Sequence, residues 1–411
     1  MRLPMLVVLV FALMVCSGCG SSKSNIVYLK GERKAVLTAP AFFMDRQGDL
    51  YPPFDIKVDV DRNEFISSSD GVRGRSSTKA TLRAYYQRHF EKGDESWTAL
   101  LDATGVDPSG VFDQDWDRIQ VALRKRVIDC FKVPVGQEVV LVIHGFNNDH
   151  GTANTWMSGF DSEVKRRRPG AQVVRMYWDG LRGNAMGIGI WGEAQFNSPR
   201  VGQSLRRILN QVDSGTKLRI FTHSLGGSVV ANALGNGGGA YNGFSQSWNA
   251  VVKERAGAMD GEWRIPRNLT DLRVAMLVPA QPPTAFNDFS LVTEGMQQGV
   301  IPSRIVVGTS EGDIATSKFI LHCGTWRTGN TCMPLRQQKT CRELRKVFDQ
   351  PGEASRVRLV NFPRPIKWYH DHGVPSYVED RTEWNELLEQ LFEDDPPIPK
   401  STVRFCPSVA S

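Results

Sequence analysis

A series of short, continuous apolar runs, separated by helix-like segments, most constrains how this chain folds. The runs are rich in Val, Ile and Leu and lack the apolar–polar alternation of a strand with one solvent-exposed face. Strands buried on both faces have this pattern, and they occur in parallel sheets that helices cover. The predicted strands are residues 138–143, 172–178, 217–221, 272–278, 304–308 and 356–361.

Segments with the character of helices lie between or beside these runs. The predicted helices are residues 113–131, 154–168, 201–213, 227–234 and 379–392. Strands that alternate with helices in this way predict an α/β domain with a doubly wound, mostly parallel sheet. Two earlier apolar runs, residues 34–43 and 54–60, are predicted to be antiparallel edge strands.

The length of 411 residues leaves room for segments outside that domain. We divide the chain into a signal-type leader (1–19), an N-terminal extension with a tether and edge strands (20–112), and an α/β domain (113–400). Hydrophobic residues are 41% and charged residues 23% of the chain, which excludes a disordered protein and a polytopic membrane protein. The net charge of +6 is scattered, so no nucleic-acid partner is predicted.

The N-terminus has the pattern of an export signal. Arg2 precedes an apolar run at residues 5–16, which is shorter than the roughly 20 residues of a membrane-spanning helix. The run ends in CSGCG at residues 16–20, and small residues before a cysteine resemble the bacterial lipoprotein signal. This resemblance implies lipidation of Cys19 and retention in the cell envelope, at the outer membrane or the periplasmic face. An ordinary cleaved signal is the alternative.

Five further cysteines follow the leader, and export would expose them to an oxidising compartment. Cys323 and Cys332 are nine positions apart in the sequence, and we predict a disulfide between them. A second bond would join Cys341 to Cys406. Because five is an odd number, at least one thiol stays unpaired.

Residues that carry chemistry follow the predicted strands. The first motif is THSLGG at residues 222–227, between a strand and a helix. A serine in such a tight turn projects its hydroxyl above the sheet edge, and small neighbours let the helix pack closely. Thr222 stands where the usual G-x-S-x-G motif has its first glycine, whereas Gly226 keeps the second. A helix start with Ser224 as a capping residue is the structural alternative.

The second motif is HGFNN at residues 144–148, directly after a predicted strand. Acyl transfer needs two fixed N–H groups about 3 Å from the developing oxyanion, and a loop in this place is suited to supply one. The backbone amides of Phe146 and Leu225 are the candidates. We expect His144 to hold the loop by a hydrogen bond.

Together the two motifs resemble the α/β-hydrolase superfamily, most closely a bacterial branch of serine hydrolases in which HGFNN precedes a T/A-H-S-x-G turn. The resemblance covers residues 133–392. It implies an α/β-hydrolase fold, here with a small N-terminal extension, and a nucleophile, an acid and a histidine base in that order along the chain. Ser224 is the implied nucleophile.

The order of the superfamily also implies the acid. Asp313 follows the predicted strand 304–308 in the TSEGD segment and matches the position of the superfamily acid. A turn aspartate without catalytic role is the structural alternative. The other carboxylates that compete for the role are Asp288, Glu311 and Asp371.

The base is implied to lie after the last predicted strand, in WYHDHG at residues 368–373. His372 begins an H-x-x-x-S-Y run that leads into the last helix, as the histidine of the superfamily does. His370 is the alternative base.

These residues predict a serine hydrolase that acts on a small-molecule or lipid carboxylic ester through a Ser-His-Asp triad and an acyl-enzyme. The mechanism uses no metal and no organic cofactor. A non-catalytic envelope binding or scaffold protein on the same fold is the rival class. A metallohydrolase that uses His144, His370 and His372 is a third reading, and a transacylase differs only in the acyl acceptor.

Substitution of Cys19 tests the lipid anchor. Cys19→Ser removes the thiol that carries the lipid, so the protein should lose fatty-acid labelling and move from the membrane to the soluble fraction. Metabolic labelling with a fatty-acid analogue, followed by fractionation, measures both effects. Cys130→Ser is the matched control, because Cys130 lies far from the leader, and it should behave as the wild type. A Cys19→Ser protein that is still lipid-labelled contradicts the assignment.

Overall fold

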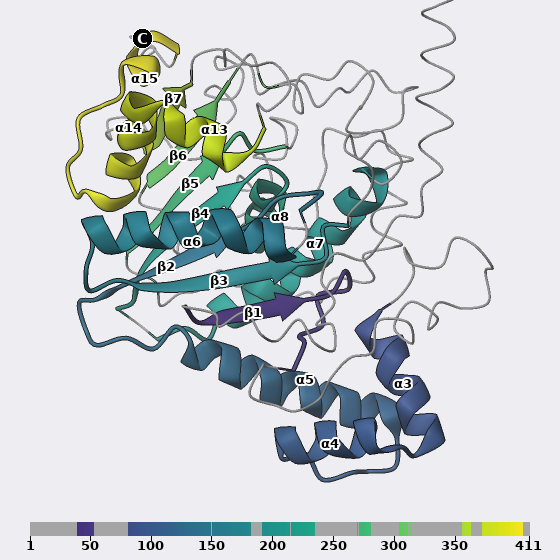
Figure 1. The fold of residues 1–411 in the computed structure, drawn as a ribbon. Coiled ribbons are helices and arrows are strands. Elements are labelled where there is room, and N and C mark those ends of the chain that lie inside the picture. Colours follow the sequence, from purple (N-terminus) through teal and green to yellow (C-terminus); the bar gives the residue numbers. More distant parts are fainter. Residues whose placement is uncertain are drawn as a thin grey trace, which may run out of the picture.

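The computed structural model describes a central sheet and the helices around it. The described residues are 39–52, 81–148, 150–181, 191–213, 215–234, 269, 271–280, 304–310, 313, 356–362 and 372–405. Among them, seven strands form one sheet with helices on both of its faces (Figure 1). The predicted α/β class with a mostly parallel sheet is therefore confirmed.

The strands of the described residues are β1 (Ala41–Met44), β2 (Glu138–Ile143), β3 (Gln172–Trp178), β4 (Lys217–His223), β5 (Asp271–Leu277), β6 (Arg304–Thr309) and β7 (Val357–Asn361). They follow the order β1-β3-β2-β4-β5-β6-β7, and each neighbouring pair is parallel. Ile143 at the end of β2 pairs with Thr222 of β4. Leu277 at the end of β5 pairs with His223 of β4 and Gly308 of β6. The carboxyl ends of these strands therefore share one edge of the sheet.

The direction of β1 shows that the prediction of an antiparallel edge strand was wrong. β1 lies at the edge of the sheet, but it pairs in parallel with β3, with Ala41 opposite Arg175 and Met44 opposite Trp178. The chain passes through several helices and β2 between β1 and β3, and so long a connection lets a strand re-enter in the same direction. The other predicted edge strand, residues 54–60, lies outside the described residues.

The helices that cover the sheet are α5 (Phe112–Asp129), α6 (His150–Arg167), α7 (Trp191–Leu209), α8 (Gly226–Leu234), α13 (Val374–Glu379), α14 (Arg381–Phe392) and α15 (Lys400–Phe405). α6 and α14 share one face, where the ring of Phe160 stacks on Phe221 with centroids 4.2 Å apart and Trp384 packs edge-on. α7 and α8 pack closely on the other face because Gly202 leaves space for Asn232: a Cβ atom at Gly202 would lie 2.6 Å from the Asn232 Cβ. None of the helices in the described ranges is long and apolar enough to span a bilayer.

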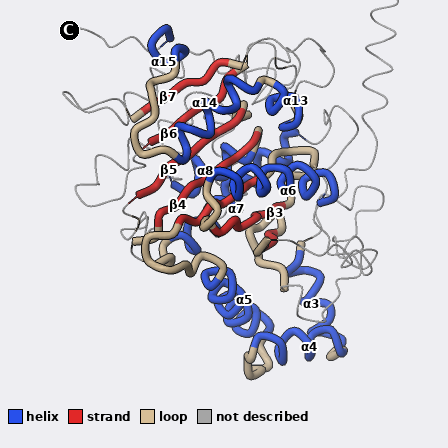
Figure 2. Tube along the Cα trace, turned by 60° about the vertical axis from the view of Figure 1, so that its left-hand side comes forward, coloured by secondary structure: helices blue, strands red, loops and turns tan. Residues whose placement is uncertain are grey.

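Two further helices, α3 (Leu82–Lys92) and α4 (Glu95–Thr104), pack against α5 and lie away from the sheet (Figure 2). The sequence predicted an extension here but not its helices. Side chains of Thr81 and Asp94 cap their N-termini, and Gly93 and Gly105 end them in the left-handed conformation.

Two polar contacts attach α3 and α5 to the loop after β1. The carboxylate of Asp45 accepts a hydrogen bond from the Leu82 amide at 2.8 Å. The Gln120 side chain bonds both the amide and the carbonyl of Leu50. All four residues are buried, so these contacts fix where the helices sit beside the sheet.

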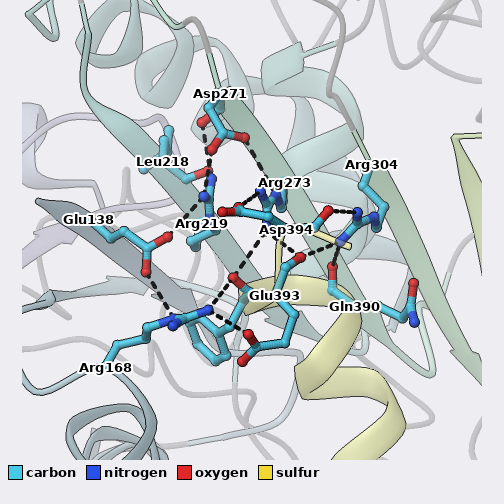
Figure 3. Close-up of polar contacts among 11 residues, drawn as sticks. Glu138, Arg168, Leu218, Arg219, Asp271, Arg273, Arg304, Gln390, Glu393 and Asp394 are labelled. Atoms are coloured by element: carbon cyan, nitrogen blue, oxygen red, sulfur yellow. Dashed lines mark hydrogen bonds and ion pairs between the residues drawn. The ribbon is translucent and has the colours of Figure 1, made fainter. Parts of the chain in front are cut away.

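An arginine cluster at the amino edge of the sheet holds the C-terminal end of α14 (Figure 3). Guanidinium groups of Arg168, Arg273 and Arg304 donate to the carbonyls of Gln390, Phe392 and Glu393 at 2.6–3.0 Å. The last carbonyls of a helix have no partner within the helix and carry the negative end of its dipole, so cations stabilise them. Because α13 and α14 directly follow His372, the arginine cluster anchors the segment that begins at this histidine.

Carboxylates balance the buried positive charges at the amino edge of the sheet. Arg219, which is fully buried in β4, pairs with Glu138 at 2.9 Å and with Asp271 at 2.6 Å. Burial, together with the charges of neighbouring guanidinium groups such as that of Arg273, lowers the pKa of Arg304 to about 10. The amino edge is therefore a paired electrostatic network rather than a free cationic surface.

Removal of one guanidinium group from the arginine cluster should cost stability. Arg273→Met leaves the carbonyls of Phe392 and Glu393 without this donor, and we expect the free energy of unfolding to fall by about 1–3 kcal/mol. Arg166→Met is the matched control, because Arg166 makes an exposed ion pair with Glu163 and should leave the denaturation midpoint unchanged. Chemical denaturation of both variants makes the comparison, and equal effects would contradict the anchoring role.

Candidate active site

Ser224 lies in the turn between β4 and α8 with a φ of 54°, in the left-handed region that residues other than glycine rarely adopt. Backbone hydrogen bonds over-determine this conformation. The Ser224 amide donates to the Leu277 carbonyl at 3.0 Å, and its carbonyl accepts from the amides of Gly227 and Ala280 at 3.0 and 3.1 Å. A strained, well-held serine between a strand and a helix is the geometry of a nucleophile elbow.

Close packing explains the glycines around this turn. A Cβ atom at Gly145 would lie 2.6 Å from the Cβ of Ser224, so only glycine lets the HGFNN loop approach the serine. A Cβ atom at Gly226 would lie 2.5 Å from the Thr222 hydroxyl and 2.7 Å from the His144 carbonyl. Thr222 thus occupies space that the usual first glycine leaves open, and Gly226 accommodates it.

Three of the predicted site residues meet at the carboxyl edge of the sheet. The Ser224 Oγ lies 2.6 Å from the His372 Nε2, and the His372 Nδ1 lies 2.7 Å from the Asp313 Oδ2. Asp313 is fully buried, whereas a quarter of the His372 side chain is exposed. A carboxylate facing Nδ1 selects the tautomer in which Nδ1 carries the proton, which leaves the Nε2 lone pair for the serine hydroxyl.

Tyr377 is a fourth member of this group, and the sequence did not predict it as a site residue. Its hydroxyl donates to the Asp313 Oδ2 at 2.6 Å, and the side chain is buried beside the ring of Phe362. The carboxylate is therefore held by Tyr377 as well as by His372. The only sequence signal was the tyrosine that ends the H-x-x-x-S-Y run, on the short helix α13.

Of the two amides predicted to bind an oxyanion, that of Leu225 directly follows Ser224 in the turn. Leu225 precedes α8, whose N-terminal end carries the positive end of the helix dipole. No backbone carbonyl in the described residues accepts from the Leu225 amide. Phe146 follows Gly145, the residue that touches Ser224, and the Asn148 side chain donates to the Phe146 carbonyl at 3.1 Å.

The expected hydrogen bond of His144 to the loop is present. Its Nδ1 donates to the Gly145 carbonyl at 2.7 Å, and its Nε2 accepts from the Trp178 amide at 3.0 Å. The Trp178 indole donates in turn to the His144 carbonyl at 2.8 Å. Burial lowers the pKa of His144 to about 4, so at neutral pH the ring is uncharged and serves as both donor and acceptor.

Other predicted residues lie outside the part of the chain that the structure describes: Cys19, Asp288, Glu311, His370, Asp371 and the cysteines of the predicted disulfides, Cys323, Cys332, Cys341 and Cys406. Cys130 is described, and its sulfur is not part of a disulfide. Within the described ranges, no group of three or more His, Cys, Asp or Glu side chains is arranged to hold a metal ion.

The fold and the site together define a parallel α/β protein that carries a hydrogen-bonded Ser-His-Asp group at the carboxyl edge of its sheet. This arrangement is compatible with an α/β-hydrolase-like fold. The chain matches no protein-family model, no curated protein and no solved structure. The geometry of the site is therefore the basis on which a function can be proposed.

Crowding at the elbow is testable with two glycine substitutions. Gly226→Ala places a Cβ atom against Thr222 and the His144 carbonyl, and we expect the free energy of unfolding to fall by about 1–3 kcal/mol. Gly159→Ala is the control, because Gly159 lies in α6 with open space around it, and alanine there should stabilise by about 0.5–1 kcal/mol. Thermal or urea unfolding separates the two cases. A Gly226→Ala protein as stable as the wild type would contradict the packing argument.

Proposed function

We propose that this chain is a serine hydrolase of carboxylic esters with an α/β-hydrolase fold. The observation that carries the proposal is the continuous chain from the Ser224 Oγ through the His372 imidazole to the Asp313 carboxylate, with contacts of 2.6 and 2.7 Å. The left-handed φ of Ser224 supports it, because that conformation costs free energy and clusters at functional sites. Ser224 is the proposed nucleophile, His372 the base and Asp313 the acid.

The reaction begins when the Ser224 Oγ attacks the ester carbonyl carbon and His372 Nε2 takes the hydroxyl proton. Asp313 accepts the Nδ1–H hydrogen bond and stabilises the imidazolium that forms. The amides of Phe146 and Leu225 donate to the oxyanion of the tetrahedral intermediate. His372 then gives its proton to the leaving alcohol, and the acyl group stays on Ser224.

Water completes the cycle. His372 removes a proton from a water molecule as its oxygen attacks the acyl carbon, and the second tetrahedral intermediate releases the carboxylic acid and restores the Ser224 hydroxyl. Every proton in this scheme moves through His372, and no step requires a metal or an organic cofactor.

The proposed substrate is a small-molecule or lipid ester, because an alkoxide is a better leaving group than an amide anion. The proposed place of action is the cell envelope, with the domain held at the membrane by a lipid on Cys19. Support for this place comes from the apolar run and the CSGCG segment of the leader.

Reaction with a fluorophosphonate probe tests the proposal, because the probe modifies a serine only when a neighbouring base activates it. The wild-type protein should be labelled at Ser224 and hydrolyse p-nitrophenyl esters. Ser224→Ala should abolish both the labelling and the ester hydrolysis. His372→Ala or Asp313→Asn should lower kcat by about 10⁴-fold. Comparison of short-chain with long-chain esters defines the preferred acyl group.

Ser162→Ala is the matched control, because Ser162 is an exposed serine of α6, and it should be labelled and active like the wild type. A folded wild-type protein that neither reacts with the probe nor hydrolyses any ester of the series would refute the hydrolase proposal. The envelope binding or scaffold class would then be the better reading.

A further inference from the structure

The histidine before Ser224 contacts the main chain of the proposed base. His223 is the last residue of β4 and is buried, and its Nε2 lies 2.6 Å from the carbonyl oxygen of His372. The two imidazole rings are also close, with centroids 4.9 Å apart. His223 and His372 are 149 positions apart in the sequence. This contact therefore joins the end of β4 directly to the segment that begins at His372.

The chemistry of the contact defines the state of His223. A carbonyl oxygen only accepts hydrogen bonds, so the Nε2 of His223 must carry the proton and donate it. The Nδ1 of the same ring is buried and has no hydrogen-bond partner among the described residues. Burial, with a smaller contribution from the charge of His372, lowers the pKa of His223 to about 3. The ring is therefore a neutral hydrogen-bond donor across the physiological pH range.

We propose that His223 is a positioning residue, which fixes the backbone of His372 relative to Ser224 through the hydrogen bond from its Nε2 to the His372 carbonyl. This inference rests on the proposed hydrolase function, and it assigns to the residue beside the nucleophile a role in the placement of the base.

The need for this contact follows from what His372 does in the cycle. Its hydrogen bond to the Ser224 Oγ is broken when the proton moves toward the leaving group and is remade when the acyl-enzyme is hydrolysed. The bond between His223 and the His372 carbonyl does not involve the reacting atoms, so it persists through every step. With the backbone held, the His372 ring needs only small side-chain rotations, and misplacement by about 1 Å can cost about 10²-fold in rate.

A neutral imidazole suits this position better than a lysine or an arginine. A cationic donor so close to His372 would disfavour the protonated imidazole that forms after Ser224 gives up its proton. The indole of Trp156 packs edge-on against His223, with centroids 6.2 Å apart, and helps hold the ring in its donor orientation. An uncharged donor therefore fixes the base without opposing its protonation.

Two amide variants of different length test the inference. The side-chain amide of His223→Gln reaches about as far as the imidazole Nε2 and should restore the donor, whereas that of His223→Asn is one methylene shorter and should not. We expect kcat for a p-nitrophenyl ester to fall by about 10²-fold in His223→Asn with KM unchanged, and most of it to return in His223→Gln. His223→Phe, which keeps a ring but has no donor, should be as slow as the asparagine variant.

Ser198→Ala separates this effect from general destabilisation. It removes the buried hydrogen bond between the hydroxyls of Ser198 and Ser228, which joins α7 to α8 and lies outside the proposed catalytic group. It should lower the thermal midpoint without lowering kcat. If His223→Asn keeps the wild-type kcat, or if His223→Gln is as slow as His223→Asn, the inference is wrong.

Failure of the underlying function has a different signature. If the wild-type protein is unreactive toward the fluorophosphonate and hydrolyses no ester, the hydrolase proposal fails and the role of His223 fails with it. If the wild type is active, Ser224→Ala is inactive and the His223 variants are unaffected, only the positioning role is overturned.

Discussion

The parallel hydrogen-bond register of the central strands positions the turns that carry Ser224 and Asp313. A parallel ladder aligns the carboxyl ends of neighbouring strands, and the pairing of His223 with Leu277 and of Leu277 with Gly308 ends β4, β5 and β6 at nearly one level. Ser224 follows the first of these strands, and Asp313 lies shortly after the third. A shift of one residue in any of these pairs would turn the side chains of that strand to the opposite face and move its loop away from the others.

Much of the fold was predictable because strands buried on both faces are visible as uninterrupted apolar runs. The predicted bounds of β2 and β3 coincide with those observed. The direction of β1 was not predictable, because it depends on how the chain returns to the sheet and not on the residues of the strand. α7 begins at Trp191, ahead of its predicted start at 201, and the helix accommodates Pro199.

The site, too, was predictable only in part. Ser224, Asp313 and His372 were selected by their order relative to the strands, and the geometry joins them in one hydrogen-bonded group. Tyr377 and the contact of His223 with the His372 carbonyl were not foreseen. Both depend on tertiary contacts of the segment that begins at His372, in which the Tyr377 hydroxyl meets Asp313 and the His372 carbonyl meets His223, and the sequence pattern did not predict these contacts.

The left-handed backbone of Ser224 also has an evolutionary consequence. Glycine adopts a φ of 54° without steric cost, so serine at this position is the less stable choice, and the proposed role of its hydroxyl accounts for it. Selection for stability without selection for the reaction would favour replacement of the serine by glycine. Among descendants of this chain, retention of serine at this one position would therefore be a record that the proposed reaction is under selection.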